Sequence, residues 1–283
     1  MTYTTLITTA ELEPRLADPT WTVVDARFDL AQPDWGEAEY RTAHLPGAVY
    51  AHLDRDLSGP KTGANGRHPL PDPDELRARL GRWGIGPGGQ VVAYDQANGM
   101  WASRVWWLLR YLGYSAVAVL DGGWTKWTAE GRPVRAGDES RPAALFQGAP
   151  RPELLLTVQQ VERFRSDPHN LLIDSRAPER YRGEVEPIDP VAGHIPGARN
   201  LYNLSNANAD GTLLPPEALR ARFRALLGDA PAANVGFYCG SGAAAAHNAL
   251  ALEVAGLSGA RVYAGSWSEW CADPGRPVAL GQA

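Results

Sequence analysis

The 283-residue chain has a net charge of −5 and no cluster of lysine or arginine, which argues against nucleic acid or an anionic membrane as its partner. Its two cysteines, Cys239 and Cys271, are too few for a disulfide framework and predict a cytoplasmic protein with reduced thiols. The start of the chain lacks the pattern of a signal peptide, and its most apolar stretch, 105–120, is interrupted by Arg110 and is too polar to cross a bilayer.

The first half of the chain alternates helical patterns with short, continuous apolar runs. Such runs, without polar alternation, are typical of strands in a parallel sheet that is covered on both faces. In chain order the predicted elements are a helix over 9–17, a strand over 21–25, a helix over 71–83, a strand over 91–94, a helix over 103–112 and a strand over 117–120. A long loop over 57–71 is rich in glycine and proline, and long loops in compact domains are often functional.

The second half repeats this order of elements and several motifs. Its predicted elements are helices over 157–165, 215–227 and 243–255 and strands over 171–174, 234–238 and 260–263. An Asp-x-Arg pair follows the first long strand in both halves, and a His-Leu/Ile-Pro-Gly-Ala turn begins at His44 and again at His194. A repeat at a steady spacing near half the chain length indicates a duplicated domain.

The alternation of strands and helices predicts an α/β fold with two tandem domains, each a mostly parallel sheet with helices on both faces. The predicted boundaries are 1–140 and 152–283, with a linker at about 135–151 that is rich in proline, glycine and charge. Asp95 stands in the first copy where Cys239 stands in the second, so we expect the chemistry in the second domain. The histidines and Asp-x-Arg pairs that both halves share are interpreted as structural.

Cys239 opens a short loop between a buried strand and an alanine-rich helix, in the sequence Cys-Gly-Ser-Gly-Ala-Ala. Gly240 and Gly242 allow the backbone to curl so that successive N–H groups point inward, and the helix that follows adds partial positive charge at its start. A cysteine in such a position is expected to hold its sulfur as a thiolate near neutral pH. The same N–H groups would stabilise a persulfide anion.

The repeated motifs together with the single cysteine loop resemble the rhodanese superfamily, specifically its tandem-domain sulfurtransferases, over essentially the whole chain. The resemblance implies an inactive first domain and a catalytic second one. It also implies that Cys239 takes a sulfur atom from a small anionic donor, becomes a persulfide and passes the sulfur to cyanide or a thiol acceptor such as thioredoxin. No cofactor is implied, and no cysteine or histidine pair has metal-ligand spacing.

Within this superfamily, a Cys-Gly-Ser-Gly-Val-Thr loop resembles 3-mercaptopyruvate sulfurtransferases and a Cys-Arg-Lys-Gly-Val-Thr loop resembles thiosulfate sulfurtransferases. The resemblance assigns Ser241 to the donor's thiol proton, and Arg180 and His68 to donor binding alongside the loop residues Gly240, Gly242, Ala243 and Ala244. Because His68 belongs to the 57–71 loop of the first half, we expect the active site between the two domains. Mercaptopyruvate is slightly favoured, with thiosulfate close behind.

Three departures leave the donor open. The second arginine that mercaptopyruvate enzymes carry after a Glu-Pro pair is Ile188 here, and Arg182 is a candidate for the missing charge. The acidic residue expected ahead of His68 is absent unless Asp56 substitutes for it. Ala243 and Ala244 replace Val-Thr, which removes a hydroxyl worth on the order of 1.5–3 kcal/mol if it bonds a charged sulfur.

Two other functions remain possible from the sequence. A non-catalytic module could hold a persulfide as a sulfur sensor without releasing it. A cysteine-dependent phosphatase would need an arginine six residues after its cysteine, and Ala245 stands there, which makes this alternative the weaker one.

Overall fold

The computed structural model describes residues 2–282, which form two compact units. The first unit contains the chain up to Gly59, Pro71–Arg151 and Ala207–Leu213. The second contains Pro60–Leu70, Pro152–Asn206 and the chain from Leu214 onward. Each unit therefore includes one short segment from the opposite half of the sequence, and Pro60–Leu70 is the one that bears on the candidate site.

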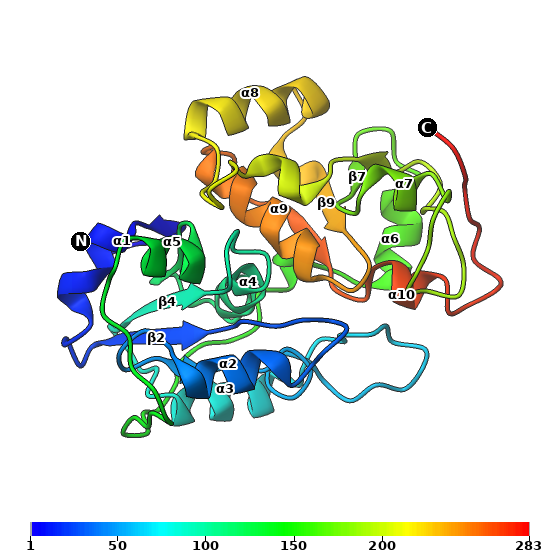
Figure 1. Cartoon of the computed structure of the whole chain (residues 1–283). Helices are drawn as coiled ribbons and strands as arrows, with labels where there is room; N and C mark the ends of the chain where they lie inside the picture. The colour runs from blue at the N-terminus through cyan, green and yellow to red at the C-terminus, as the bar shows by residue number, and fades with distance from the viewer. Residues whose placement is uncertain (1, 283) are drawn as a thin grey trace. The chain divides into compact units, whose positions relative to one another are not determined.

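The first unit is built on a five-stranded parallel sheet (Figure 1). Its strands are β1 (Leu6–Ile7), β2 (Trp21–Asp25), β3 (Val49–Tyr50), β4 (Gln90–Tyr94) and β5 (Val117–Leu120), in the spatial order β1-β5-β4-β2-β3. Its helices are α1 (Thr9–Leu12), α2 (Trp35–Thr42), α3 (Pro73–Arg82), α4 (Ala102–Tyr111) and α5 (Gly123–Ala129), with a 3₁₀ turn, η1, over Glu13–Arg15. The predicted α/β class is confirmed.

The second unit repeats this topology. Its parallel sheet has the order β6-β10-β9-β7-β8, made of β6 (Leu155–Leu156), β7 (Leu171–Asp174), β8 (Arg199–Asn200), β9 (Val235–Tyr238) and β10 (Arg261–Tyr263). Its helices are α6 (Val158–Phe164), α7 (Pro178–Tyr181), α8 (Pro216–Leu227), α9 (Ala243–Val254) and α10 (Ser266–Trp270), with 3₁₀ turns η2 (Pro152–Leu154), η3 (Asn203–Asn206) and η4 (Ala232–Asn234).

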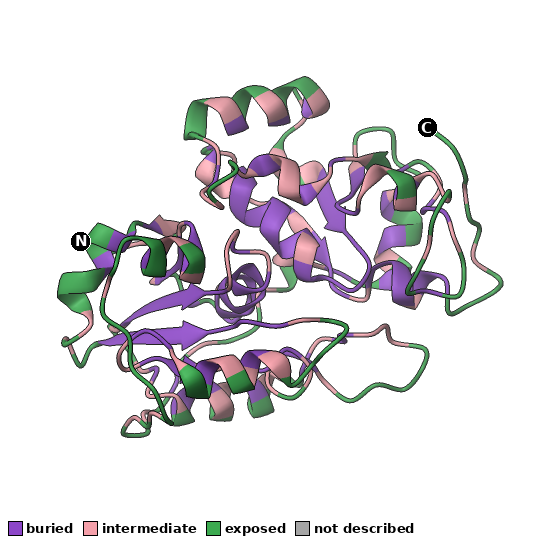
Figure 2. Ribbon diagram, in the orientation of Figure 1, coloured by how far each residue is buried: buried purple, intermediate pink, exposed green. Residues whose placement is uncertain are grey.

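Both faces of each sheet are covered, which explains why the central strands are continuously apolar. In the second unit, one face of the sheet packs in a single cluster with side chains of α6 and α10, among them Val161 and Trp267. Helix α9 contacts β9 and β10, and none of its side chains belongs to that cluster. Figure 2 shows β2, β4 and β9 buried throughout and α9 buried along most of its length. A parallel sheet with two buried faces requires such residues.

The Asp-x-Arg pairs are structural in both units, as predicted. Arg176 lies against Asp174 with its Nη2 atom 2.6 Å from the carboxylate, and the same nitrogen donates to the carbonyl of Gly193 at 2.7 Å. Arg27 forms the equivalent pair with Asp25 and donates to the carbonyl of Ala43. Each pair thus ties the end of a central strand to the turn that carries the repeated histidine.

Residues 135–151, the predicted linker, follow the surface of the first unit. Arg135 pairs with His44 through backbone hydrogen bonds, and the N–H of Ala144 donates to the carbonyl of Gly81 at 2.9 Å. Phe146 is buried there. Over residues 2–282, no helix combines the length and the apolar character needed to cross a membrane.

Candidate active site

Cys239 is the first residue after β9, at the carboxyl end of a central strand, where parallel α/β sheets place their ligands. Its Sγ atom accepts hydrogen bonds from the backbone N–H of Gly242 at 3.0 Å and of Ser241 at 3.4 Å. Gly242 has a φ of 95°, in the left-handed region, and α9 begins at the next residue. The curled loop expected from the two glycines is therefore present, with the sulfur at its centre.

The start of α10 holds this loop in place from outside. The N–H groups of Trp267 and Ser268 donate to the carbonyls of Cys239 at 2.9 Å and Gly240 at 3.0 Å. The hydroxyl oxygen of Ser266 accepts from the N–H of Cys239 at 3.1 Å and lies 4.0 Å from its sulfur. Residues 266–268 therefore support the cysteine loop through backbone and hydroxyl hydrogen bonds.

His68 lies against Ser241. The Nδ1 atom of His68 is 2.7 Å from the Ser241 hydroxyl oxygen, and both side chains are buried. The two residues are 173 positions apart in the sequence, and Pro60–Leu70 brings the histidine into the second unit. The structure thus joins two of the residues that the resemblance assigned to the site.

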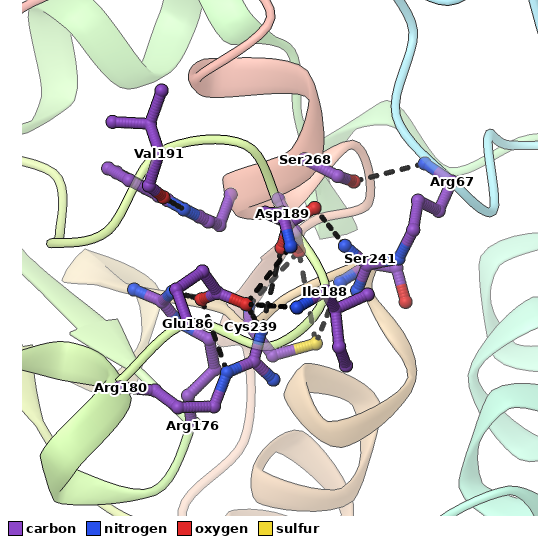
Figure 3. Close-up of polar contacts among 12 residues, drawn as sticks. Arg67, Arg176, Arg180, Glu186, Ile188, Asp189, Val191, Cys239, Ser241 and Ser268 are labelled. Atoms are coloured by element: carbon purple, nitrogen blue, oxygen red, sulfur yellow. Dashed lines mark hydrogen bonds and ion pairs between the residues drawn. The ribbon is translucent and has the colours of Figure 1, made fainter. Parts of the chain in front are cut away.

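Arg180 is held beside the loop by a buried carboxylate (Figure 3). Its Nη2 atom lies 2.6 Å from Oε1 of Glu186 and 3.5 Å from the carboxylate of Asp189. Glu186 also accepts from Arg176 and from the N–H groups of Ile188 and Asp189, each at 3.1 Å. Burial acts to raise the pKa of Glu186, but the hydrogen bonds and charge from Arg180 and these N–H groups outweigh it and leave the pKa below its ordinary value.

Arg67, which the sequence analysis did not single out, brings a second guanidinium to the loop. Its Nη2 atom lies 2.7 Å from the point where a Cβ on Gly240 would stand, and both terminal nitrogens of Arg180 lie 3.7 Å from that point. Its other terminal nitrogen forms an ion pair with Asp189. The only signal in the sequence was a charged residue directly before His68 in the long loop.

Two sequence-based candidates lie elsewhere. The guanidinium of Arg182 pairs with the exposed carboxylate of Glu184, at 2.7 and 2.8 Å, whereas Arg67 is the second guanidinium that lies at Gly240. Asp56 accepts from the N–H of His52 at 2.9 Å and pairs with Arg79 at 3.3 Å. Its carboxylate is therefore held by groups of the first unit.

Ala243 and Ala244 are the first two residues of α9, with Ala243 buried and Ala244 partly exposed. Their methyl groups offer no hydroxyl at the start of the helix, as the sequence indicated. Cys271, the other cysteine of the chain, is buried. Its pKa is raised to about 11, by burial first and then by the charges of Asp189 and Glu186.

Asp95 occupies the matching loop of the first unit and closes it. Its two carboxylate oxygens accept four backbone hydrogen bonds, from the N–H groups of Ala97, Gly99, Trp101 and Ala102 at 2.7–3.2 Å. The loop that holds a sulfur in one unit therefore holds a carboxylate in the other. Among residues 2–282, no group of three or more histidine, cysteine or acidic side chains is arranged to bind a metal ion.

Comparison with known proteins agrees with this duplicated architecture. The model of the rhodanese-like domain matches residues 8–130 and again residues 157–273. A Pseudomonas aeruginosa protein provisionally named as a 3-mercaptopyruvate sulfurtransferase is 48% identical over 98% of both chains. A Mycobacterium tuberculosis protein provisionally named as a thiosulfate sulfurtransferase is 42% identical, also over 98% of both chains.

The same fold is found among solved structures. The crystal structure of the 3-mercaptopyruvate sulfurtransferase SseA from Escherichia coli superimposes with a TM-score of 0.81 at 29% identity, covering 94% of this chain and 99% of that one.

Proposed function

The chain belongs to the rhodanese family as a tandem-domain sulfurtransferase, and on this basis we propose that it moves the sulfur of 3-mercaptopyruvate, through a persulfide on Cys239, to a thiol or cyanide acceptor. The observation that carries the proposal is the pair of N–H groups on the Cys239 sulfur, next to a serine hydroxyl that is bonded to a histidine. The first feature stabilises a sulfur anion, and the second can move a proton.

The transfer of sulfur from mercaptopyruvate to Cys239 needs no added oxidant or reductant. The Cys239 thiolate attacks the donor sulfur, an S–S bond forms, and the carbon–sulfur bond breaks with its electron pair left on carbon as the enolate of pyruvate. The thiol proton of the donor leaves through Ser241, with His68 as its partner, and the enolate takes up one proton to become pyruvate. A Cys239 persulfide anion remains, and the two N–H groups that hold the thiolate also suit it.

The charges around the loop favour a donor with one negative charge over dianionic thiosulfate. Three arginines and three carboxylates are paired with one another around the loop, so little uncompensated positive charge remains for a dianion. The pairs are Asp174 with Arg176, Glu186 with Arg176 and Arg180, and Asp189 with Arg67 and Arg180. The loop adds no cation of its own. A side chain at position 240, such as the arginine of a thiosulfate-type loop, would also meet Arg67.

The reactivity of a persulfide supports the proposed acceptor, and the reduced cysteines support the proposed compartment. A persulfide passes its outer sulfur to a nucleophile, which can be cyanide or a thiol such as that of thioredoxin. Reduced thiols on both cysteines suit the cytoplasm, where we place the enzyme.

The test is steady-state turnover with each donor and a common thiol acceptor. The proposal predicts that pyruvate is released from mercaptopyruvate with a kcat/KM at least about tenfold above that for thiosulfate, a difference of about 1.4 kcal/mol in activation free energy. Cys239→Ser should abolish both reactions. A preference for thiosulfate would overturn the choice of donor, and turnover by Cys239→Ser would overturn the mechanism.

A further inference from the structure

Two guanidinium groups converge on one small region beside Cys239. The Nη2 atom of Arg67 and both terminal nitrogens of Arg180 lie within 3.7 Å of the point where a Cβ on Gly240 would stand. Figure 3 shows both side chains directed toward the cysteine loop from different segments of the chain. An anion that binds Arg180 next to the reactive sulfur would therefore lie within reach of Arg67 as well.

The position of Arg67 is tied to the loop through its backbone. Its N–H donates to the hydroxyl oxygen of Ser268 at 3.0 Å, and the N–H of Ser268 donates to the carbonyl of Gly240 at 3.0 Å. Gly66, with a φ of +84°, allows the close approach, because a Cβ there would lie 2.7 Å from the carbonyl oxygen of Gly265. The chain therefore presents Arg67 to Gly240 in a defined way.

Asp189 joins the two guanidiniums while leaving them accessible. Its carboxylate pairs with both Arg67 and Arg180, and its own side chain is only 3% exposed. The arginine side chains are 24% and 18% exposed, so an anion from solvent can approach them. Each guanidinium has several N–H donors in a planar fork, and a carboxylate on Asp189 does not use them all.

We propose that Arg67 binds the donor's carboxylate together with Arg180 and so determines donor specificity. This inference rests on the proposed function and deepens it. The residue that follows Glu186-Pro187 in this chain is the exposed, apolar Ile188, which offers no charge. Arg67 supplies the second cation from a different segment, and two guanidiniums can hold the two carboxylate oxygens and orient the donor sulfur toward Cys239.

The experiment compares Arg67→Gln and Arg67→Lys with the unmodified enzyme, using kcat and KM for mercaptopyruvate and the inhibition constant of pyruvate. Pyruvate carries the carboxylate without the sulfur, so it reports anion binding apart from chemistry. Loss of a charged hydrogen bond predicts that Arg67→Gln raises both KM and the inhibition constant by about 10-fold to 100-fold, with a smaller effect on kcat. Arg67→Lys should recover part of the loss.

Arg77→Gln is the matched control, because Arg77 is also a partly exposed arginine paired with one aspartate. It should leave KM and the inhibition constant within about twofold of the unmodified enzyme, as expected for a surface change. Thermal unfolding of each variant distinguishes a loss of anion binding from a loss of protein stability. A lower Tm for Arg67→Gln with unchanged pyruvate inhibition would assign Arg67 a structural role only and overturn the proposal.

The inference can fail separately from the proposed function. If the unmodified enzyme accepts only thiosulfate, the donor assignment is wrong, and the KM of Arg67→Gln for thiosulfate then decides whether Arg67 binds the donor anion. If the unmodified enzyme uses mercaptopyruvate and Arg67→Gln has the same KM and inhibition constant, the function stands and the inference is wrong.

Discussion

The Nδ1 atom of His68 lies 2.7 Å from the hydroxyl oxygen of Ser241, two residues after Cys239 in the same unit. The serine donates its own backbone N–H to the cysteine sulfur. Ser241 therefore contacts the sulfur through its backbone N–H and the histidine through its hydroxyl, and the proposed removal of the donor's thiol proton uses both contacts.

Ser241→Ala should impair transfer from mercaptopyruvate far more than transfer from thiosulfate. Thiosulfate has no thiol proton to lose, whereas mercaptopyruvate does, and a positioned proton-transfer group contributes about 10²-fold or more. We expect kcat for mercaptopyruvate to fall by about that factor. The measurement is kcat for both donors, with persulfide formation followed in a single turnover. An equal loss for both donors would remove Ser241 from proton transfer.

Gly240→Ala should act through Arg67. The new methyl group would stand 2.7 Å from the Arg67 guanidinium, the far end of a flexible side chain, so the guanidinium should move and the fold should be kept. We expect KM for mercaptopyruvate to rise severalfold. In an Arg67→Gln background the same substitution should have much less effect, because residues in contact are not additive. Full additivity of the two changes in KM would contradict the contact.

Asp95→Asn should destabilise the first unit. Each carboxylate oxygen of Asp95 accepts two backbone N–H groups, and an amide nitrogen in place of one oxygen would leave two buried donors without an acceptor. The expected loss in the free energy of unfolding is about 1–3 kcal/mol, measured by urea titration. Asp138→Asn, at an exposed carboxylate, is the control and should change it by less than about 0.5 kcal/mol. Equal effects of the two substitutions would refute the role given to Asp95.

Cys271 should resist alkylation in the folded protein. Its pKa is raised to about 11, chiefly by burial, so at pH 8 its sulfur is almost entirely the unreactive thiol. Iodoacetamide at pH 8 should leave Cys271 unlabelled in the folded enzyme, as mass spectrometry of the separate Cys239 and Cys271 peptides can show. The same reagent in denaturant should label both. Rapid labelling of Cys271 in the folded enzyme would contradict its burial.

Most of the fold could be predicted because its central elements are long and repeated. The continuous apolar runs correctly indicated β2, β4, β7 and β9. Edge strands of two residues, such as β1 and β6, are too short to show a pattern. Helix α2 was missed because it buries only Gly36 and Tyr40, which leaves no apolar stripe along the sequence.

The cysteine loop was also predictable, because its chemistry lies in adjacent residues. The position of Arg67 beside this loop could not be predicted, because it depends on a hydrogen bond to Ser268, 201 positions away. Local sequence places a charged residue in a loop but does not say which loop it will contact. The packing of Pro60–Leu70 in the second unit likewise depends on contacts between distant parts of the sequence, which composition does not reveal.

Cys239 should accept one sulfur from mercaptopyruvate and keep it as a persulfide. The most direct measurement is the intact mass of reduced protein after brief exposure to mercaptopyruvate or to thiosulfate without an acceptor, with Cys239→Ser as the control. The proposed persulfide mechanism predicts a gain of one sulfur with mercaptopyruvate, little with thiosulfate, and none in the variant. A gain of sulfur by Cys239→Ser, or no gain by the unmodified protein with mercaptopyruvate, would contradict it.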